Sequence, residues 1–531
     1  MLAIGTMDFV VFALYIVAVL LIGFLAGRKK DAQAEGFFLA RGRLPWYTVG
    51  FAMVATSIST EQFIGASAKA YEVGLAVIHW EWGMFPSFAL LIFVFMPLYF
   101  RRRIITIPEY LERRFSPLAR SIFSAMTLVS YFIINLAGVL FSGGYFMHQV
   151  FGFPVVTCIW LLAVLTGVYT VYGGMSSVAW TETLQCVLLI AGGLFITAIG
   201  LMHIPGGFMA AVGTGERAHL FLPIDHPELP WTSILVLMFS TNVWYACTNQ
   251  FYIQMCLGAK NEWSARMGVV FATFLGILLG LAIEFTGIVG YRLAEIGAMP
   301  APPEPNAVFP YLIRYMIPAG LRGVVYAGIF AAIMSTISSL IHSIATLFSV
   351  DFYRVYIRPD TTDRHLVTVG RITGGILLAA AALWAPIVGT FPTIFDYFQQ
   401  SWAVMAAPFA VIFTTGALWK RATNRGAIVT MLIGVAMIPI TFWLVKRILP
   451  TGFNFYNLVG IEFLLLVGIM IAVSLTSSPP GSEVVRTAVW TRDLANLPPE
   501  ECPRPYSWYK NLWLWWGVSV SCMITLYILF W

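Results

Sequence analysis

The sequence predicts an all-α membrane protein with about fourteen transmembrane helices. Of its 531 residues, 59% are apolar and 11% are charged, whereas roughly 25% of the residues in soluble domains are charged. Apolar stretches close to 20 residues long, the length that crosses ~30 Å of hydrocarbon, occur about fourteen times. The basic residues are concentrated in alternate connections between these stretches.

The candidate spans follow one another along the whole chain. In order, they cover residues 8–26, 45–69, 75–100, 120–150, 154–172, 177–202, 231–256, 265–292, 310–350, 366–390, 393–417, 424–446, 454–476 and 511–531. The connections between them are too short for a separate soluble domain, so we expect the function to lie within the membrane.

The distribution of Lys and Arg predicts how the chain is oriented. Short cytoplasmic connections carry an excess of basic residues. If the N-terminus lies outside, the cytoplasmic connections at 27–44, 101–120, 257–266, 351–371, 418–426 and 477–510 hold 24 of the 31 Lys and Arg residues. We therefore expect a multi-pass protein of the inner (plasma) membrane with both termini outside.

The same features exclude several classes of protein. The net charge of +6 arises from the membrane-proximal connections, so a nucleic-acid partner is not expected. The first apolar stretch follows Asp8 with no basic residue before it, which predicts a retained helix and not a signal peptide. The six cysteines form no paired motif, so the sequence predicts neither a disulfide framework nor a zinc site.

The second and seventh spans contain polar runs at mid-depth. Residues 56–62 read TSISTEQ and residues 240–250 read STNVWYACTNQ. Such runs are tolerated where they line a cavity or where a helix is broken. The alternative is a pair of continuous helices joined by Ser and Thr contacts.

The two polar spans are separated by the spacing of an inverted repeat of five helices plus five, whose first members are discontinuous. The first repeat would cover residues 45–202, and the second, with a preceding extracellular loop, residues 203–417. Residues 1–44 would form the first helix and a cytoplasmic loop, and residues 418–531 three C-terminal helices.

Four hydroxyl residues lie close together in the ninth span: Ser335, Thr336, Ser338 and Ser339. Hydroxyl oxygens can replace the water shell of Na⁺, and neutral oxygens suit a cation that must leave again. Hydroxyls in transmembrane helices also commonly bond to carbonyls of their own helix. The run alone leaves both interpretations open.

Four longer motifs carry a resemblance to a known family: ISTEQFIG at Ile58–Gly65, TIPEYLERRF at Thr106–Phe115, YGGMSSVAWTETLQ at Tyr172–Gln185 and AAIMSTISS at Ala331–Ser339. Together they resemble the sodium/solute symporter family, with the sodium/galactose and sodium/glucose branch the most similar. The resemblance runs from the first span to the last. It implies a LeuT-like inverted-repeat core and Na⁺-coupled symport of a small neutral polyhydroxylated solute, a monosaccharide, by alternating access.

The resemblance also implies two ion sites. The sodium ligands of the family correspond to backbone oxygens of Ala55, Ile58 and Ala332 and to the hydroxyls of Ser335 and Thr336. Some members bind a second Na⁺, and the matching positions here are Ser338, Ser339 and Glu182. Glu182 replaces the usual Asp and is one carbon longer, so it could serve an inner gate instead.

The substrate ring of the sugar branch corresponds to Gln62, Glu81, Asn242 and Gln399. Carboxylates and amides present fixed acceptors and donors to sugar hydroxyls. The resemblance further implies an inner aromatic gate at Tyr245 and an outer gate formed by Phe395 with Trp80. Mid-span Glu81 has a structural alternative, namely pairing with a neighbouring helix.

Two positions depart from the galactose-transporter pattern, because Gly276 replaces a pocket lysine and Met84 replaces a pocket serine. Other solutes, such as an inositol, a sugar acid, an amino acid or a carboxylate, therefore remain as alternatives. Glu284, Asp396, His148 and His342 also lie at membrane depth without an assigned role.

Two other functional classes fit the sequence less well. A channel would need a continuous polar path, whereas the polar residues here cluster at mid-depth between aromatic ones. A membrane enzyme would need a nucleophile and a base, and no such pair occurs at helical spacing. We therefore expect a transporter and not an enzyme, with Na⁺, a small solute and the lipid bilayer as its partners and no obligate protein partner.

Overall fold

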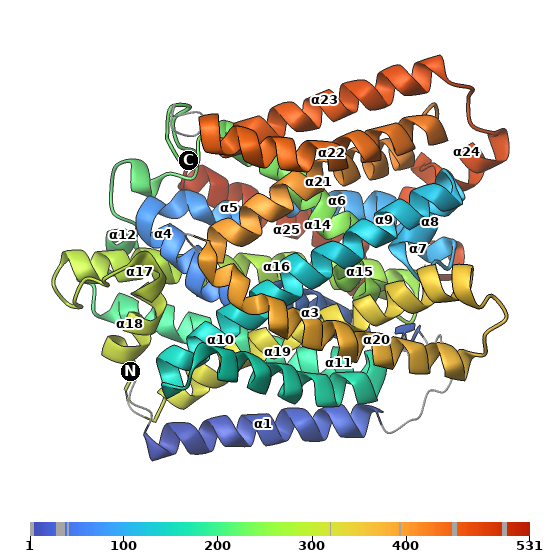
Figure 1. Cartoon of the computed structure of the whole chain (residues 1–531). Coiled ribbons are helices and arrows are strands. Elements are labelled where there is room, and N and C mark those ends of the chain that lie inside the picture. Colours follow the sequence, from blue (N-terminus) through green and yellow to red (C-terminus); the bar gives the residue numbers. More distant parts are fainter. Residues whose placement is uncertain are drawn as a thin grey trace.

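The protein is a bundle of helices that run roughly side by side (Figure 1). The computed structural model describes residues 5–27, 38–39, 42–318, 320–391, 394–448, 454–501 and 507–531. Within these residues there is no β-strand, only the isolated bridges Leu44–Ala259 and Leu222–Pro230. The all-helical class predicted from the sequence is therefore confirmed.

Long helices alternate with short or interrupted ones along the chain. The first part contains α1 (Thr6–Gly27), α3 (Trp46–Ser57), η2 (Glu61–Ala66), α4 (Ser67–Val73), η3 (Leu75–Ile78), α5 (His79–Trp82), α6 (Phe85–Leu90), η4 (Leu91–Phe95), α7 (Met96–Arg101), α8 (Ile107–Arg114), α9 (Pro117–Val129), η5 (Ser130–Leu136), α10 (Ala137–Phe151) and α11 (Val155–Met202). Next come α12 (Gly207–Val212), η6 (Glu216–Ala218), α13 (Trp231–Val236), η7 (Leu237–Thr241), α14 (Asn242–Thr248), α15 (Gln250–Leu257), α16 (Glu262–Ala282) and α17 (Glu284–Glu295).

The remaining elements are η8 (Pro305–Ala307), α18 (Val308–Met316), α19 (Arg322–Leu347), η9 (Phe348–Ile357), α20 (Asp363–Trp384), η10 (Ala385–Thr390), α21 (Ile394–Leu418), α22 (Asn424–Ile448), α23 (Phe455–Thr476), α24 (Ser482–Ala488), η12 (Arg492–Ala495), η13 (Pro499–Glu501), η14 (Trp508–Lys510) and α25 (Leu512–Leu529). The turns η2, η4, η5, η7 and η9 are π-helical. Short π-helical turns inside helices are frequent at functional sites.

Ten helical stretches among the described residues are long and apolar enough to cross a membrane, and Thr6–Ile22 and Val155–Val168 are shorter apolar helices. Two predicted spans, 45–69 and 231–256, are absent from both groups. Each of these is divided into shorter helices, because α3 ends at Ser57 and α14 ends at Thr248.

Helix α11 differs from the expectation of two spans with a connection at residues 173–176. All 48 of its residues are helical, which corresponds to about 72 Å at 1.5 Å per residue, more than twice the hydrocarbon thickness. The start of α11 follows α10, whose Tyr145 bonds to Glu304 at 3.1 Å. Near the other end, Gly200 packs against Val289 of α17.

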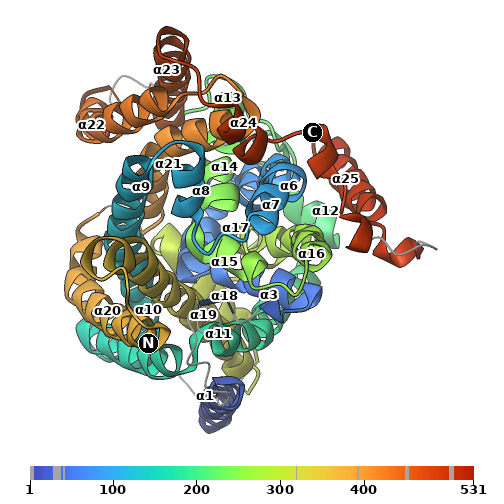
Figure 2. The same cartoon turned by 90° about the vertical axis from the view of Figure 1, so that its right-hand side faces the viewer.

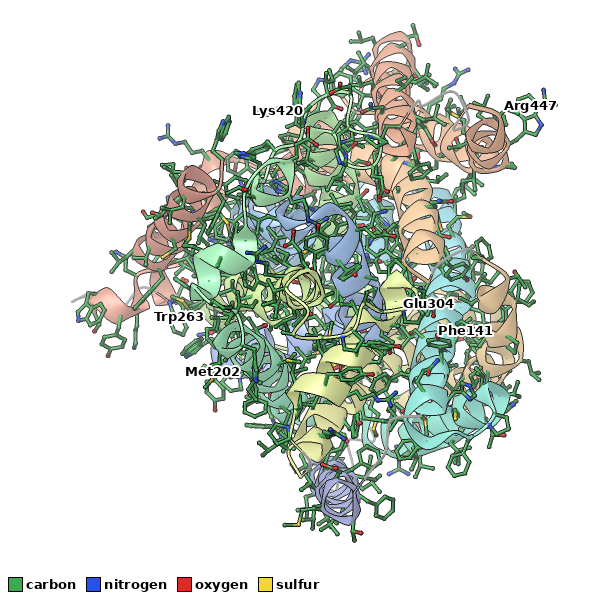
Figure 3. The ribbon with its side chains drawn as sticks, turned by 90° about the vertical axis from the view of Figure 1, so that its left-hand side faces the viewer. Phe141, Met202, Trp263, Glu304, Lys420 and Arg447 are labelled. Carbon is green, nitrogen blue, oxygen red and sulfur yellow. The ribbon has the colours of Figure 1, made fainter. Side chains whose placement is uncertain are left out.

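Both ends of α11 therefore lie at the end of the bundle that contains Glu304 and Met202, which is the end facing the viewer in Figure 3. The stretch folds back on itself, and its two halves correspond to the two expected spans. Because a straight helix could not return to the same end, the chain must bend sharply between the halves, although no separate loop divides them.

The expected ninth span, 310–350, is also divided. Helix α18 ends at Met316, and Ile317 has an extended backbone (φ −89°, ψ 123°). The residue before a proline avoids the helical region, and Pro318 follows Ile317. The span itself is α19 with η9, and 94% of its most apolar window is buried. It packs against α1, α3, α11 and α20 at the centre of the bundle.

The basic connections gather at one end of the bundle. Arg101 bonds to Glu262 at 2.8 Å, Arg120 pairs with Asp351, and Arg421 donates to Ser477 O at 2.7 Å. Figure 2 looks onto this end, with α8, α15 and α24 towards the viewer. Helix α1 lies at one side of the bundle, and α22 and α23 lie at the opposite side in Figures 1 and 2.

A close contact between α4 and α17 depends on Gly287. A Cβ at this position would lie 2.0 Å from Ser67 O. The two helices also share hydrogen bonds, because Ser67 Oγ lies 3.0 Å from Ile283 O and 2.8 Å from Thr286 Oγ1. Small residues allow such close approach of membrane helices.

We predict that Gly287→Ala destabilises the protein by about 1–3 kcal/mol, because α17 must move away from α4 and lose these bonds. The melting temperature of the detergent-purified protein measures the effect. Gly375→Ala in α20 is the matched control, since a Cβ there meets no atom within 4 Å. Equal melting temperatures for the two variants would contradict the close contact.

Candidate functional site

The second span is interrupted immediately after α3. Ile58 has an extended backbone (φ −111°, ψ 126°), so the carbonyls at the end of α3 lose their helical partners. The side chain of Gln62 bridges the interruption. Its Oε1 accepts a hydrogen bond from Ser59 N at 2.7 Å, and its Nε2 donates to Ser57 O at 2.9 Å.

The seventh span is interrupted at Asn249, which lies between α14 and α15 and is extended (φ −74°, ψ 121°). Tyr131 donates to Asn249 Oδ1 at 3.2 Å. Gln250 Oε1 accepts from Ile107 N at 2.7 Å. The interruption thus contacts the side chain of Tyr131 and the backbone of Ile107, and it lies at the end of the polar run and not in its middle.

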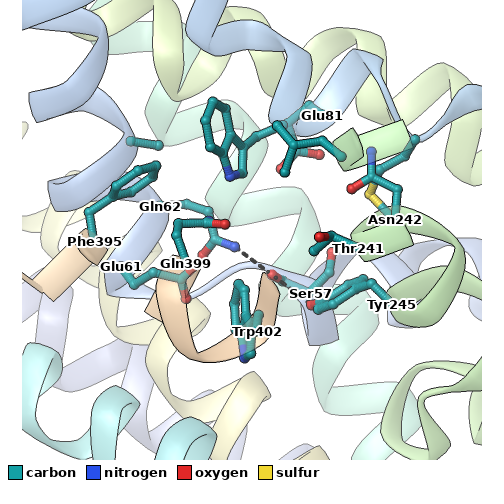
Figure 4. Close-up of a pocket in the computed structure, with 14 residues that line it drawn as sticks. Ser57, Glu61, Gln62, Glu81, Thr241, Asn242, Tyr245, Phe395, Gln399 and Trp402 are labelled. Carbon is teal, nitrogen blue, oxygen red and sulfur yellow. Dashed lines mark hydrogen bonds between the residues drawn. The ribbon is translucent and has the colours of Figure 1, made fainter. Parts of the chain in front are cut away.

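A cavity with an empty volume of about 570 Å³ lies beside the first interruption. Figure 4 shows side chains from α5, α14 and α21 around it, with Glu81 opposite Trp402. The lining residues are Ser57, Glu61, Gln62, Ala66, Trp80, Glu81, Met84, Leu237, Thr241, Asn242, Tyr245, Phe395, Gln399 and Trp402. All four expected substrate residues and all three expected gate residues are among them.

Three polar groups in the cavity wall make no hydrogen bond within the described part of the chain: Asn242 Nδ2, Trp80 Nε1 and Thr241 Oγ1. Gln62 also keeps one amide hydrogen after bridging the interruption, whereas its Oε1 accepts from Ser59 N and lies 3.4 Å from Ser59 Oγ. A buried polar group without a partner costs about 1–3 kcal/mol. These groups therefore fit a ligand that supplies several hydrogen-bonding atoms.

The charges in the cavity wall are acidic. Glu61 and Glu81 line it, and none of the lining residues given above is basic. Glu61 is 3% exposed and accepts a hydrogen bond from Ser59 Oγ at 2.8 Å. Met84 is in the wall, whereas Gly276 is not, and a Cβ on Gly276 would meet no atom within 4 Å.

Two pairs of aromatic rings cover the cavity from different sides. Trp80 and Phe395 have ring centroids 5.3 Å apart with a 59° tilt. Tyr245 and Trp402 are 5.7 Å apart with a 55° tilt. Phe395 and Trp80, which we expected to act together as the outer gate, are therefore in direct contact.

The five oxygen atoms of the expected sodium site lie together where the end of α3 meets α19. Ser335 Oγ is 2.7 Å from Ala55 O and 2.9 Å from Ala332 O. Thr336 Oγ1 is 2.9 Å from Ile58 O and 3.1 Å from Ala332 O. Each hydroxyl has one hydrogen, with two neighbouring carbonyls for Ser335 and three for Thr336, so lone pairs remain for a small cation. Carbonyls of an unwound helix are typical Na⁺ ligands.

A second polar cluster lies along α19, on the side facing α11. Glu182 Oε1 accepts hydrogen bonds from Thr56 Oγ1 at 3.1 Å and from Ser339 Oγ, and these two hydroxyls are 3.0 Å apart. Glu182 Oε2 makes no hydrogen bond in the part of the chain described. Ser338 instead donates to Ser335 O at 2.8 Å, so its hydroxyl bonds to its own helix.

The residues without an assigned role have different environments. Glu284 is fully buried, and neither of its carboxylate oxygens has a partner among the described residues. His342 Nε2 lies 3.4 Å from Phe38 O, and His148 Nδ1 lies 2.7 Å from Phe153 O. The side chain of Asp396 lies outside the described part.

Several residues of these sites were not predicted from the sequence, among them Glu61, Thr241, Trp402 and Thr56. The first two belong to the polar runs, so their position at mid-depth was a usable signal. Trp402 follows Gln399 by three residues, which places it on the same face of α21. Thr56 was indistinguishable from its hydroxyl neighbours, because only the packing of α3 on α11 turns it towards Glu182.

Comparison with known proteins decides the family. The model of the sodium:solute symporter family matches residues 37–434, which is most of the chain. The chain is a member of this family. The expected resemblance is thereby confirmed.

Relatives in this family transport different solutes. The chain is 33% identical over 497 residues to a sodium/glucose cotransporter of Vibrio parahaemolyticus, covering 89% of this chain and 90% of that one. It is 27% identical over 562 residues to a sodium/myo-inositol cotransporter of Bos taurus, covering 95% and 78%.

Solved structures confirm the fold alone. The substrate-bound outward-open state of a Na⁺-coupled sialic acid symporter superposes with a TM-score of 0.77 at 22% identity, covering 90% of this chain and 98% of that one. A nucleobase-cation-symport-1 transporter in a closed conformation gives 0.53 at 14% identity, covering 85% and 97%.

Proposed function

We propose that this protein is a secondary active transporter that couples Na⁺ entry to uptake of a small neutral polyhydroxylated solute, a monosaccharide. The observation that carries the proposal is the set of unpartnered polar groups around one buried cavity, adjacent to a cluster of neutral oxygens on α3 and α19. The sodium/glucose and sodium/myo-inositol relatives support this class of solute.

We assign the chain fourteen spans with a LeuT-like core of two inverted five-helix repeats, residues 45–202 and 203–417, after a first helix in 1–44 and before three helices in 418–531. The extended residues Ile58 and Asn249 support discontinuous second and seventh spans. The gathering of basic connections at one end supports a cytoplasmic location for that end, and thus an outer location for both termini in the inner membrane.

The chemistry of coupling follows from shared residues. Na⁺ at Ala55, Ile58, Ala332, Ser335 and Thr336 would join the interrupted second span to α19. The segment after the interruption carries Gln62 and Glu61 into the cavity. Sodium binding would therefore favour one arrangement of the cavity wall, and the solute would bind that arrangement more tightly.

The acidic wall bears on the choice of solute. A neutral sugar or inositol can donate hydroxyl hydrogens to Glu81 and Gln399 and accept from Asn242 and Trp80. An anionic sugar acid would place a carboxylate among Glu61 and Glu81 without a basic partner in the wall, which is unfavourable at low dielectric. We therefore favour neutral solutes over sugar acids and carboxylates.

The test of the whole proposal is uptake into proteoliposomes with an imposed Na⁺ gradient and a mixed pool of sugars, inositols, amino acids and carboxylates, read by mass spectrometry. Enrichment of a neutral polyol only when Na⁺ is present supports it. Enrichment of an amino acid or a carboxylate would contradict the proposed substrate class and assign the protein a different one.

We predict that Ser335→Ala or Thr336→Ala raises the Na⁺ concentration needed for half-maximal uptake at least several-fold, because each variant removes one ligand. The measurement is initial uptake rate against Na⁺ concentration. Thr415→Ala is the control, since the Thr415 hydroxyl bonds to Val411 O of its own helix. Full transport in choline buffer without an inward Na⁺ gradient would exclude sodium coupling.

A second prediction concerns Glu182, which we propose to hold another Na⁺ together with Ser338 and Ser339. Uptake should then show a Hill slope above one for Na⁺. The hydrogen bonds of Ser339 and Thr56 to Glu182 predict that Ser339→Ala brings the slope towards one more strongly than Ser338→Ala. A slope of one in the unmodified protein would leave Glu182 with an inner-gate role instead.

A third prediction concerns Glu81. Glu81→Gln keeps the size of the side chain but loses its charge, so neutral-sugar binding should weaken by about 1.5–3 kcal/mol. Calorimetry in saturating Na⁺ with glucose, galactose, inositol and one acidic sugar measures this. Gln399→Glu is the complementary variant, which should further disfavour the acidic sugar. Unchanged neutral-sugar binding by Glu81→Gln would remove Glu81 from the site.

A further inference from the structure

A second cavity lies at the basic end of the bundle, away from the solute site. Its empty volume is about 680 Å³, and it is lined by Leu98, Arg102, Ile104, Tyr110, Arg113, Thr487 and Ala488. It lies where α7, α8 and α24 meet, and these helices are neighbours in Figure 2. Tyr110 joins two of its walls by donating to Ala488 O at 3.0 Å.

The cavity has an excess of positive charge. Arg113 pairs with Glu109 and donates to Arg102 O at 2.6 Å. Within the described residues, the Arg102 guanidinium has no acidic partner within 4.0 Å. Burial, and then the nearby charges of Arg113 and Arg486, lower the pKa of Arg102. The cavity lining thus holds two guanidinium groups, and Arg486, which is 3.6 Å from the largely exposed Glu483, lies near enough to act on Arg102.

Next to this cavity, the backbone of Arg103 adopts a left-handed conformation that is unfavourable for a residue other than glycine. Arg103 has φ +48° and is the only non-glycine residue with positive φ in the described part. It follows the end of α7, where its N–H donates to Phe100 O at 3.0 Å and Ile104 N donates to Tyr99 O at 3.3 Å. Glycine usually occupies this position after a helix. An arginine there stands between the lining residues Arg102 and Ile104 despite an unfavourable backbone.

Orientation in the membrane does not account for this arrangement. Basic residues that set topology need only lie in the connection; they need neither a cavity nor a left-handed backbone. The cavity also has an apolar wall of Leu98 and Ile104, and it opens where the apolar span Leu75–Arg101 ends. Basic pockets at this depth on the cytoplasmic side suit anionic headgroups.

We propose that this cavity is a binding site for a phosphate group, with Arg102 and Arg113 as its principal ligands and Arg103 and Arg486 at its rim. Guanidinium groups bind phosphate oxygens through paired hydrogen bonds. The phosphate could belong to an anionic phospholipid of the adjacent leaflet or to a soluble phosphate ester. The site is independent of the solute cavity.

The test uses the full-length protein in two arms. In the first, phosphatidylcholine nanodiscs with and without phosphatidylglycerol are compared by native mass spectrometry of retained lipid and by melting temperature. In the second, inorganic phosphate and glycerol phosphate are added to detergent-purified protein. The variants are Arg102→Gln with Arg113→Gln, and Arg103→Gly. Arg425→Gln, an exposed arginine at the start of α22, is the matched control.

We expect phosphatidylglycerol retention and a rise in melting temperature of several degrees in the unmodified protein and in Arg425→Gln, with both lost in the double variant. Arg103→Gly should raise the melting temperature in phosphatidylcholine alone, because glycine relieves the backbone, yet reduce lipid retention several-fold. A higher melting temperature together with weaker lipid retention would distinguish a binding role of Arg103 from a structural one. A response only to glycerol phosphate would assign the site to soluble esters.

The proposal is overturned if neither arm gives a response that the double variant abolishes, or if Arg425→Gln loses the response equally. Retention of lipid by Arg103→Gly at the level of the unmodified protein would remove Arg103 from the site.

Discussion

The structure depends on how it satisfies backbone groups that are freed inside the membrane. Hydrocarbon offers no hydrogen bonds, so each helix interruption needs partners from the protein itself. At the end of α3 these partners are the hydroxyls of Ser335 and Thr336, which lie within hydrogen-bonding distance of Ala55 O and Ile58 O, and the amide of Gln62. Helix α19 carries these hydroxyls and is buried at the centre of the bundle, where it packs against α3.

This requirement links the two proposed ligands of the transporter. The hydroxyls that satisfy the freed carbonyls are the same groups that would bind Na⁺, so the ion would replace hydrogen bonds that already exist. Gln62 belongs both to the interruption and to the cavity wall. An ion at α19 can thus change the solute cavity through one short segment, without a long chain of intermediate contacts. The free energy of Na⁺ binding would be the difference between the ion's contacts with these oxygens and the hydrogen bonds that it replaces. A small difference suits reversible binding.

Hydrophobicity, charge and motifs were sufficient for the family, the all-helical membrane fold and the seven predicted substrate and gate residues that line the cavity, but not for the rest of its wall. Polar runs identified which spans are interrupted, because a mid-membrane Glu or Asn requires a cavity or a broken helix. These sequence features did not predict to which partner each hydroxyl of α19 donates its hydrogen bond. Ser338 and Ser339 are adjacent, yet one bonds to its own helix and the other to Glu182. Side-chain direction depends on which face of α19 meets α11, and the sequence does not specify that packing.

The interruption of the seventh span illustrates the same limit. The polar run centres near Trp244, but the extended residue is Asn249. Its partner Tyr131, and the partner Ile107 of the adjacent Gln250, are far away in sequence.

Substrate choice is a separate question from fold, and local charge bears on it more directly than overall similarity. The sialic acid symporter shares the fold at 22% identity, but fold similarity at that level does not carry a substrate. In this chain the cavity wall holds Glu61 and Glu81, and Gly276, the position that the resemblance matches to a pocket lysine of the galactose transporter, lies outside the lining. A lysine could neutralise one of these carboxylates and fix its hydrogen-bonding direction. Without it, the acids must be satisfied by hydroxyl donors from the solute, by water or by a proton, and the first of these is what a neutral polyol supplies. We therefore expect the acidic wall to favour a neutral polyol, a preference that sequence identity alone would not reveal.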